Sequence, residues 1–106
     1  MTAIEKALQQ RILVLDGAMG TMLQAYKFEE EDFRGDRFTT HPSPLKGNND
    51  LLSLTQPEAI KAVHRAYFEV GADIVETNTF SSTSIGKADY AMEDWVYELN
   101  VQSAKL

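Results

Sequence analysis

The sequence of 106 residues contains no cysteine and only two histidines, His41 and His64. Without cysteine, neither a disulfide framework nor a thiolate metal site can be built from this chain. Two histidines that lie far apart in the sequence also argue against a zinc site made from the chain's own side chains. We therefore expect no metal to be bound by this chain alone.

Basic residues are scarce as well, with 10 lysines and arginines against 16 aspartates and glutamates and a net charge of −6. Nucleic acids and anionic membranes select basic surfaces, so neither is an expected partner. The N-terminus has no long apolar run, because Glu5, Lys6 and Gln9 interrupt it. The sequence therefore predicts neither a signal peptide nor a membrane span, and we expect a cytoplasmic location.

Two short apolar runs are present, ILVL at residues 12–15 and DIVET at residues 73–77. Continuous apolar runs of this length, followed by glycine or polar residues, are typical of strands buried in a parallel sheet. Helical periodicity predicts helices over residues 2–10, 20–26, 55–70 and 93–106. Capping-box spacings mark the first and third of these, at Thr2 with Glu5 and at Thr55 with Glu58, and Pro57 lies in the first turn of the third. Strands that alternate with helices in this way predict an α/β fold with a parallel sheet.

The segment 27–54 shows neither a helical nor a strand period. It contains an acidic run, Glu29–Asp32, scattered prolines and glycines, and the aromatic residues Phe28, Phe33 and Phe38. Acidic runs are most often solvated, so we interpret this segment as a long loop that its phenylalanines attach to the body of the protein.

The last predicted helix runs to Leu106 without a terminating glycine or proline. Two strands do not form a stable parallel sheet by themselves, because both faces and both edges require covering. We therefore expect the chain to be the first part of a larger domain.

The carboxyl ends of parallel strands meet at one edge of a sheet, which would bring Asp16 and Gly17 close to residues 76–80. Asp16 is suited to accept a hydrogen bond from a ligand ammonium group. Gly17 and Gly20 would let backbone N–H groups approach a ligand carboxylate. In the structural alternative, Asp16 caps the following turn and Glu76, expected to be buried, pairs with a core lysine or arginine.

Several motifs together resemble the homocysteine S-methyltransferase family. They are LDGAMGTML at residues 15–23, PLKGNND at 44–50, SLTQP at 53–57, GADIVETNTFSSTSI at 71–85 and ADY at 88–90. The resemblance covers residues 11–106. Segment Lys46–Pro57 is most similar to the cobalamin-dependent methionine synthases of this family, because relatives that use betaine or S-methylmethionine have a different connection there.

The resemblance implies that residues 1–106 are the N-terminal part of a homocysteine-binding domain. In fold terms, it implies the first two βα units of a (β/α)₈ TIM barrel, preceded by a short N-terminal helix, with the barrel incomplete in this chain. It also implies a homocysteine pocket at the carboxyl ends of the strands. The pocket residues implied in this way are Asp16, Gly17, Met19, Glu76, Thr77, Asn78 and Phe80.

The resemblance further implies a reaction. In the family, a zinc ion held by three cysteines activates the thiol of homocysteine, which then takes a methyl group from methylcobalamin to give methionine. The implied partners are homocysteine, the remaining barrel and separate folate- and cobalamin-binding domains. Because this chain has no cysteine, we expect it to carry no catalytic residue, to bind neither zinc nor cobalamin alone, and to be inactive in isolation.

Two alternatives stay open. One is a homocysteine methyltransferase that uses another donor, S-methylmethionine or betaine. The other is a non-catalytic fragment that binds an amino acid or pairs with a second chain.

Overall fold

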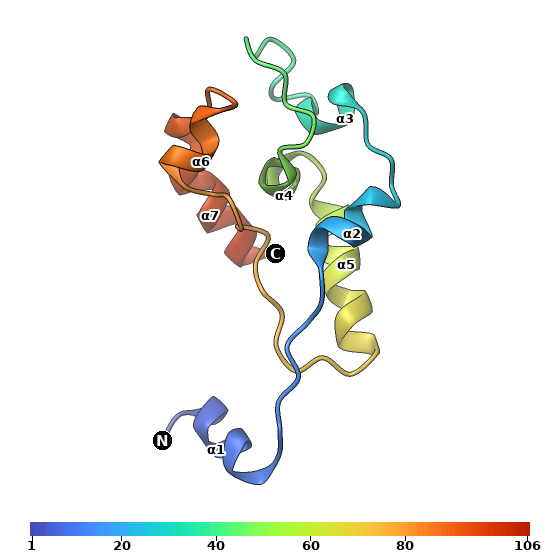
Figure 1. Cartoon of the computed structure of the whole chain (residues 1–106), viewed down its shortest axis with the longest axis vertical. Helices are drawn as coiled ribbons and strands as arrows, with labels where there is room; N and C mark the ends of the chain where they lie inside the picture. Colours follow the sequence, from blue (N-terminus) through green and yellow to red (C-terminus); the bar gives the residue numbers. More distant parts are fainter.

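The computed structural model describes all 106 residues, of which 54% are helical and 2% have strand conformation. The elements are α1 (Ala3–Gln10), α2 (Met19–Gln24), α3 (Glu30–Arg34), the 3₁₀ helix η1 (Asn49–Leu51), α4 (Leu52–Thr55), α5 (Pro57–Glu69), α6 (Ser84–Ala88), the 3₁₀ helix η2 (Glu93–Trp95) and α7 (Val96–Lys105). They form an elongated molecule of 51 × 27 × 18 Å, with α1 at one end, apart from the other helices (Figure 1). None of these helices combines the length and apolar character needed to cross a membrane.

The predicted α/β fold, with two βα units of a (β/α)₈ barrel, is wrong for this structure, which contains no sheet. The two segments predicted as strands are extended and approach each other, but only Leu15 and Ile74 pair, in parallel. No further strand lies beside them. The side chains of Ile12, Val14 and Leu15 are at least half exposed, with Ile12 at 87%. A single pair of parallel strands lacks the cover that stabilises such sheets, so the pairing stops after one step.

Asp73 holds the two extended segments together. Its carboxylate forms a bidentate ion pair with Arg11, at 2.8 and 2.9 Å, and accepts the N–H of Val14 at 2.8 Å. The hydrogen bond from Arg11 contributes most to lowering the pKa of Asp73 to about 2, and the N–H of Val14 adds to it. The contact therefore depends on ionised Asp73.

We predict that this contact weakens in acid. A carboxyl group whose pKa is lowered on folding contributes stability above its unfolded value, near 3.8, and this contribution is lost as the pH falls toward about 2. Asp73→Asn should remove the pH dependence of the amide signals of Val14 and Ile74 between pH 4 and pH 2. The measurement is a titration followed by NMR, with Asp36→Asn at an exposed site as the control. If the amide signals of Val14 and Ile74 changed with pH in Asp73→Asn as they do in the wild type, the assignment of this pH dependence to Asp73 would be contradicted.

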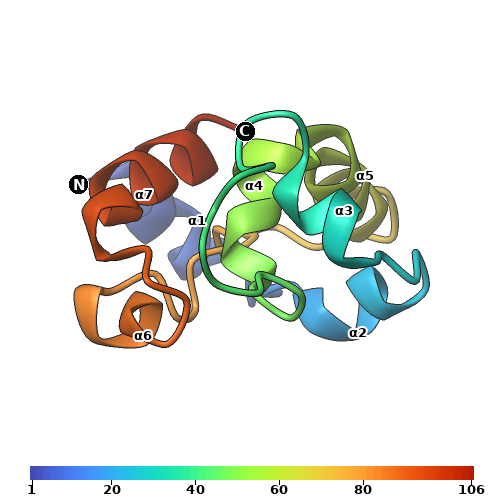
Figure 2. The same ribbon diagram turned by 90° about the horizontal axis from the view of Figure 1, so that it is seen from above.

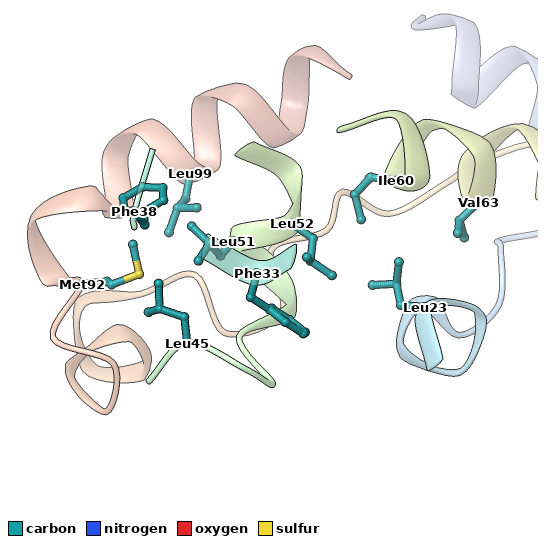
Figure 3. Packing of buried hydrophobic residues seen from close by; sticks show 10 residues of the cluster. All are labelled: Leu23, Phe33, Phe38, Leu45, Leu51, Leu52, Ile60, Val63, Met92 and Leu99. Atoms are coloured by element: carbon teal, nitrogen blue, oxygen red, sulfur yellow. The ribbon is translucent and has the colours of Figure 1, made fainter. Parts of the chain in front are cut away.

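The hydrophobic core lies among α2, α3, α4, α5 and α7, away from the predicted sheet. Helix α4 contacts α3, α5 and α7 and occupies the centre of the molecule (Figure 2). Figure 3 shows Leu51 and Leu52 in the middle of the buried cluster, both fully inaccessible. The complete cluster is Leu23, Phe33, Phe38, Leu45, Leu51, Leu52, Ile60, Val63, Met92 and Leu99.

The interpretation of residues 27–54 as a long loop holds for residues 27–29 and 35–48, but it is wrong for residues 30–34 and 49–54. This segment forms α3, η1 and α4 and supplies half of the buried cluster. The acidic run is the first turn of α3, where negative charge is favoured by the helix dipole. Glu29 and Asp32 form a capping box there. The phenylalanines do attach the segment to the body, since Phe33 and Phe38 are buried.

Glu30 and Arg34 fasten the irregular stretch that follows α3. The Glu30 carboxylate accepts N–H groups from Leu45 at 2.8 Å and from Lys46 at 2.9 Å, and it pairs with Arg34 at 2.8 Å. Desolvation acts to raise the pKa of Glu30, but these three donors together hold it below its ordinary value. The guanidinium also donates to the carbonyl groups of Phe38, His41 and Ser43.

Several predicted helices are confirmed. Helix α1 begins with the expected capping box of Thr2 and Glu5, α5 begins at Pro57, and η2 with α7 covers residues 93–105. The predicted capping box of Thr55 and Glu58 is wrong, because α5 has Gln56 at its N-cap and no side-chain cap. No residue of α1 is buried, and none belongs to the hydrophobic cluster. The capping box therefore specified the helix but not its place in the fold.

Candidate functional site

One cleft of about 530 Å³ brings together all seven residues proposed from the sequence as pocket residues. Its walls come from segments 16–20, 47–50, 76–81 and 86–90, in which every residue except Asn48 and Ala88 lines the cleft. The two extended segments supply the first and third walls, although they form no sheet. The pairing of Leu15 with Ile74 and the clamp by Asp73 bring Asp16 and Glu76 to the same place. Their role as ligand contacts remains a prediction.

Asp16 is half-buried in this cleft and takes part in no ion pair. Its Oδ2 accepts the N–H of Glu76 at 3.2 Å. The alternative that Asp16 caps the following turn is wrong, because α2, which begins at Met19, has Ala18 at its N-cap and no side-chain cap. The carboxylate therefore keeps hydrogen-bonding capacity for a ligand.

Glu76 is exposed, which corrects the expectation that it would be a buried charge in a strand. It forms no ion pair with a lysine or arginine, so the structural alternative for this residue is also wrong. The strand was predicted to be covered on both faces, and the missing cover leaves Glu76 in contact with solvent. Exposure removes the energetic need for a partner inside the protein.

Gly17 is needed for close packing at the end of the first extended segment. A Cβ atom on Gly17 would lie 2.8 Å from the hydroxyl oxygen of Tyr67 and 2.9 Å from its ring. The same hydroxyl donates a hydrogen bond of 2.9 Å to the carbonyl of Ala18. Glycine therefore lets α5 hold the backbone that follows Asp16.

The wall from Thr77 to Phe80 presents different groups to the cleft. The hydroxyl groups of Thr77 and Thr79 lie 2.7 Å apart and share a hydrogen bond. Asn78 is buried, and its amide donates to the carbonyl of Asn49 at 2.8 Å, so it fastens the wall from behind. Phe80 is 99% exposed at the rim. On the opposite wall, Met19 packs against the core.

Sequence reasoning missed the buried polar residues at this cleft, Asn48, Asp50 and Lys87. Lys87 is 1% exposed and pairs with Asp50 at 2.9 Å, and it also donates to the side-chain oxygen of Asn48. Three polar residues in a row, Asn48 to Asp50, directly before an apolar pair were a visible signal of a buried polar group. Its partner Lys87 lies 37 positions after Asp50, and no sequence pattern around this lysine indicated that it would be buried.

The charge of the cleft favours a ligand that carries a positive group. Four carboxylates line it, from Asp16, Asp50, Glu76 and Asp89, against the single cation Lys87. Lys87 is already paired with Asp50, so the surplus charge is negative. A concave surface of one sign concentrates ligands of the opposite sign.

His64, on α5, lies close enough to Asp16 to respond to its charge. Burial lowers the pKa of this histidine, and the neighbouring carboxylate partly opposes the change. Its Nδ1 atom is buried without a hydrogen-bond partner. The side chain does not line the cleft, so we assign it no contact with a ligand.

The residues do not fit a zinc or cobalamin site. No three side chains among histidine, cysteine, aspartate and glutamate are grouped as metal ligands, and the chain has no cysteine. Only four of the eighteen residues that line the cleft are hydrophobic, which does not suit the broad apolar face of a corrin ring. We derive no chemical step through either group.

The cleft is lined mostly by polar residues, and three of its carboxylates, from Asp16, Glu76 and Asp89, form no ion pair. Comparison with known families identifies the class more closely. Residues 13–106 match the sequence model of the homocysteine S-methyltransferase family, and the chain belongs to this family. Its members are methyltransferases, and the match includes all four walls of the cleft.

Proposed function

We propose that this chain binds the amino-acid end of homocysteine within a methyltransferase that transfers a methyl group to the homocysteine sulfur. The observation that carries the proposal is the Asp16 carboxylate, which lies half-buried in the cleft without a cationic partner. The ammonium group of an amino acid supplies such a partner. The family match supports homocysteine as that amino acid.

The other lining residues have complementary roles in this proposal. Gly17 lines the cleft next to Asp16 and leaves room for Tyr67 behind it, and Glu76 adds a second carboxylate. The hydroxyl of Thr77 offers a neutral polar group. Phe80, exposed at the rim, covers the apolar part of the ligand. Activation of the thiol is assigned to parts of the protein other than these residues.

We further propose that the parent enzyme is a cobalamin-dependent methionine synthase, located in the cytoplasm, in which methylcobalamin is the methyl donor. Support comes from segment Lys46–Pro57, which carries the resemblance to this branch and contributes Gly47, Asn49 and Asp50 to the cleft. The proposed partners are the folate- and cobalamin-binding domains of that enzyme. The isolated chain is expected to form no methionine from homocysteine and methylcobalamin, which an assay of the purified chain tests directly.

Asp16→Asn tests the proposed binding site. A hydrogen bond to a charged group is worth roughly 1.5–3 kcal/mol, so its loss should weaken homocysteine binding by about 10- to 100-fold. Isothermal titration calorimetry with L-homocysteine measures the change. Asp36→Asn, an exposed aspartate outside the cleft, should bind as the wild type does.

A second ligand makes the test specific for the ammonium group. 4-Mercaptobutanoate has the thiol and the carboxylate of homocysteine but no amino group. Its affinity should be weak and equal for the wild type and Asp16→Asn. Equal affinity of both proteins for L-homocysteine, or failure of the wild type to bind it, would overturn the proposal.

A further inference from the structure

A buried ionic contact joins two walls of the cleft. The Lys87 ammonium lies 2.9 Å from the Asp50 carboxylate, and both side chains are almost fully enclosed. Asn48 accepts a further hydrogen bond from Lys87, and the ring of Tyr90 lies 5.2 Å from the ammonium nitrogen. The contact ties segment 48–50 to α6, which lies far from it in the sequence.

The same carboxylate also holds the third wall. Oδ2 of Asp50 accepts the backbone N–H of Ser81 at 3.2 Å, and it is the oxygen that contacts Lys87. Three residues earlier, Asn78 donates to the carbonyl of Asn49 at 2.8 Å. The wall from Asn78 to Ser81 is therefore attached to the 48–50 segment at both ends.

Close packing at α6 leaves this wall little room to move. A Cβ atom on Gly86 would lie 2.5 Å from the carbonyl oxygen of Ser81, so the backbone of the helix packs directly against the wall. Lys87 follows Gly86 in the same helix. The Asp50 carboxylate therefore contacts α6 through Lys87 and the wall through the N–H of Ser81.

We propose that Asp50 and Lys87 are a positioning pair. They fix the wall from Asn78 to Ser81, which includes Phe80, and through it the neighbouring Thr77, without contacting the ligand. Lys87 satisfies the charge of Asp50 and so keeps the carboxylate oriented toward the N–H of Ser81. The expected effect on homocysteine binding rests on the function proposed above. The expected effect on the position of the wall does not.

An exposed ion pair elsewhere provides a matched control. Arg37 and Glu98 lie 2.7 Å apart and also join two segments distant in sequence. Neither residue lines the cleft, and both side chains are at least one third exposed. Removing this pair reports on the loss of a cross-link whose two residues do not line the cleft.

The experiment compares Lys87→Met, Asp50→Asn and the double variant with Arg37→Met. Amide hydrogen exchange followed by NMR measures the exchange rate of the Ser81 amide in the wall. The amides of α5 are the internal reference for global stability. We expect Lys87→Met to speed exchange at Ser81 at least tenfold more than in α5. Arg37→Met should change the exchange rates at Ser81 and in α5 equally or not at all.

Calorimetry with L-homocysteine gives the second readout. Lys87→Met should weaken binding about tenfold, and Arg37→Met should leave it unchanged. If a single variant fails to fold, the uncharged double variant takes its place, because it leaves no buried charge unpaired. In the double variant exchange at Ser81 should still exceed that of the wild type.

The outcomes distinguish this inference from the proposed function. If the wild type fails to bind homocysteine, the proposed function fails, and exchange at Ser81 alone decides the positioning role. If homocysteine binds but Ser81 exchanges at the wild-type rate in a folded variant that lacks the pair, the positioning role is overturned. Equal loss of affinity in Arg37→Met and Lys87→Met would also overturn it.

Discussion

Replacing Lys87 with methionine is expected to lower the free energy of unfolding by about 3–5 kcal/mol, because it leaves the Asp50 carboxylate buried without its cation. Methionine has a similar length and remains compatible with the enclosed site, so little of the loss should come from an empty volume. Urea denaturation followed by circular dichroism measures the change. A loss of this size is a large fraction of the stability of a small domain.

The double variant Asp50→Asn/Lys87→Met separates the unpaired charge from the loss of packing. Because the neutral pair has no buried charge to compensate, its loss of stability should be clearly smaller than that of Lys87→Met alone. Arg37→Met, at a partly exposed pair, should cost no more than about 1 kcal/mol. Equal losses in the single and the double variant would contradict the assignment of the pair as a charge contact.

Truncation of Leu51 to alanine should lower the free energy of unfolding by about 2–5 kcal/mol, since this side chain is fully buried in the middle of the core. The cost combines lost apolar contacts with the cavity that remains. Leu51 belongs to the segment that the sequence presented as a loop. The same urea titration measures the effect.

Ile85→Ala is the matched control for Leu51→Ala, because Ile85 is 89% exposed. It removes an aliphatic side chain from the surface and should change stability by less than about 0.5 kcal/mol. If Leu51→Ala were as mild as Ile85→Ala, the core would not lie around α4.

Local signals in the sequence were sufficient for the longer helices. The capping box of Thr2 and Glu5 and the proline at the start of α5 act within one turn, so they do not depend on the rest of the fold. The short helices α3 and α4 were missed, because helices of four or five residues are stable only through tertiary packing. For α3 the acidic run was nevertheless a signal of its first turn.

The prediction of two buried strands was wrong because the tertiary packing that such strands require is missing. An apolar run such as ILVL has high strand propensity, but a parallel sheet forms only when neighbouring strands and covering helices are present. In this structure the run has one partner residue, and its side chains remain exposed. Propensity therefore predicted the extended backbone correctly but not its burial.

The sequence by itself determined the family, the long helices and the residues that meet in the cleft. These follow from local sequence patterns. Motifs such as DGAMGT and ETNTF can be recognised without knowledge of the tertiary structure. Only the tertiary structure decided that there is no sheet, that α4 is the centre of the core and that Lys87 pairs with Asp50. Burial and ion pairing at these places depend on contacts between residues far apart in the chain, which no local pattern specifies.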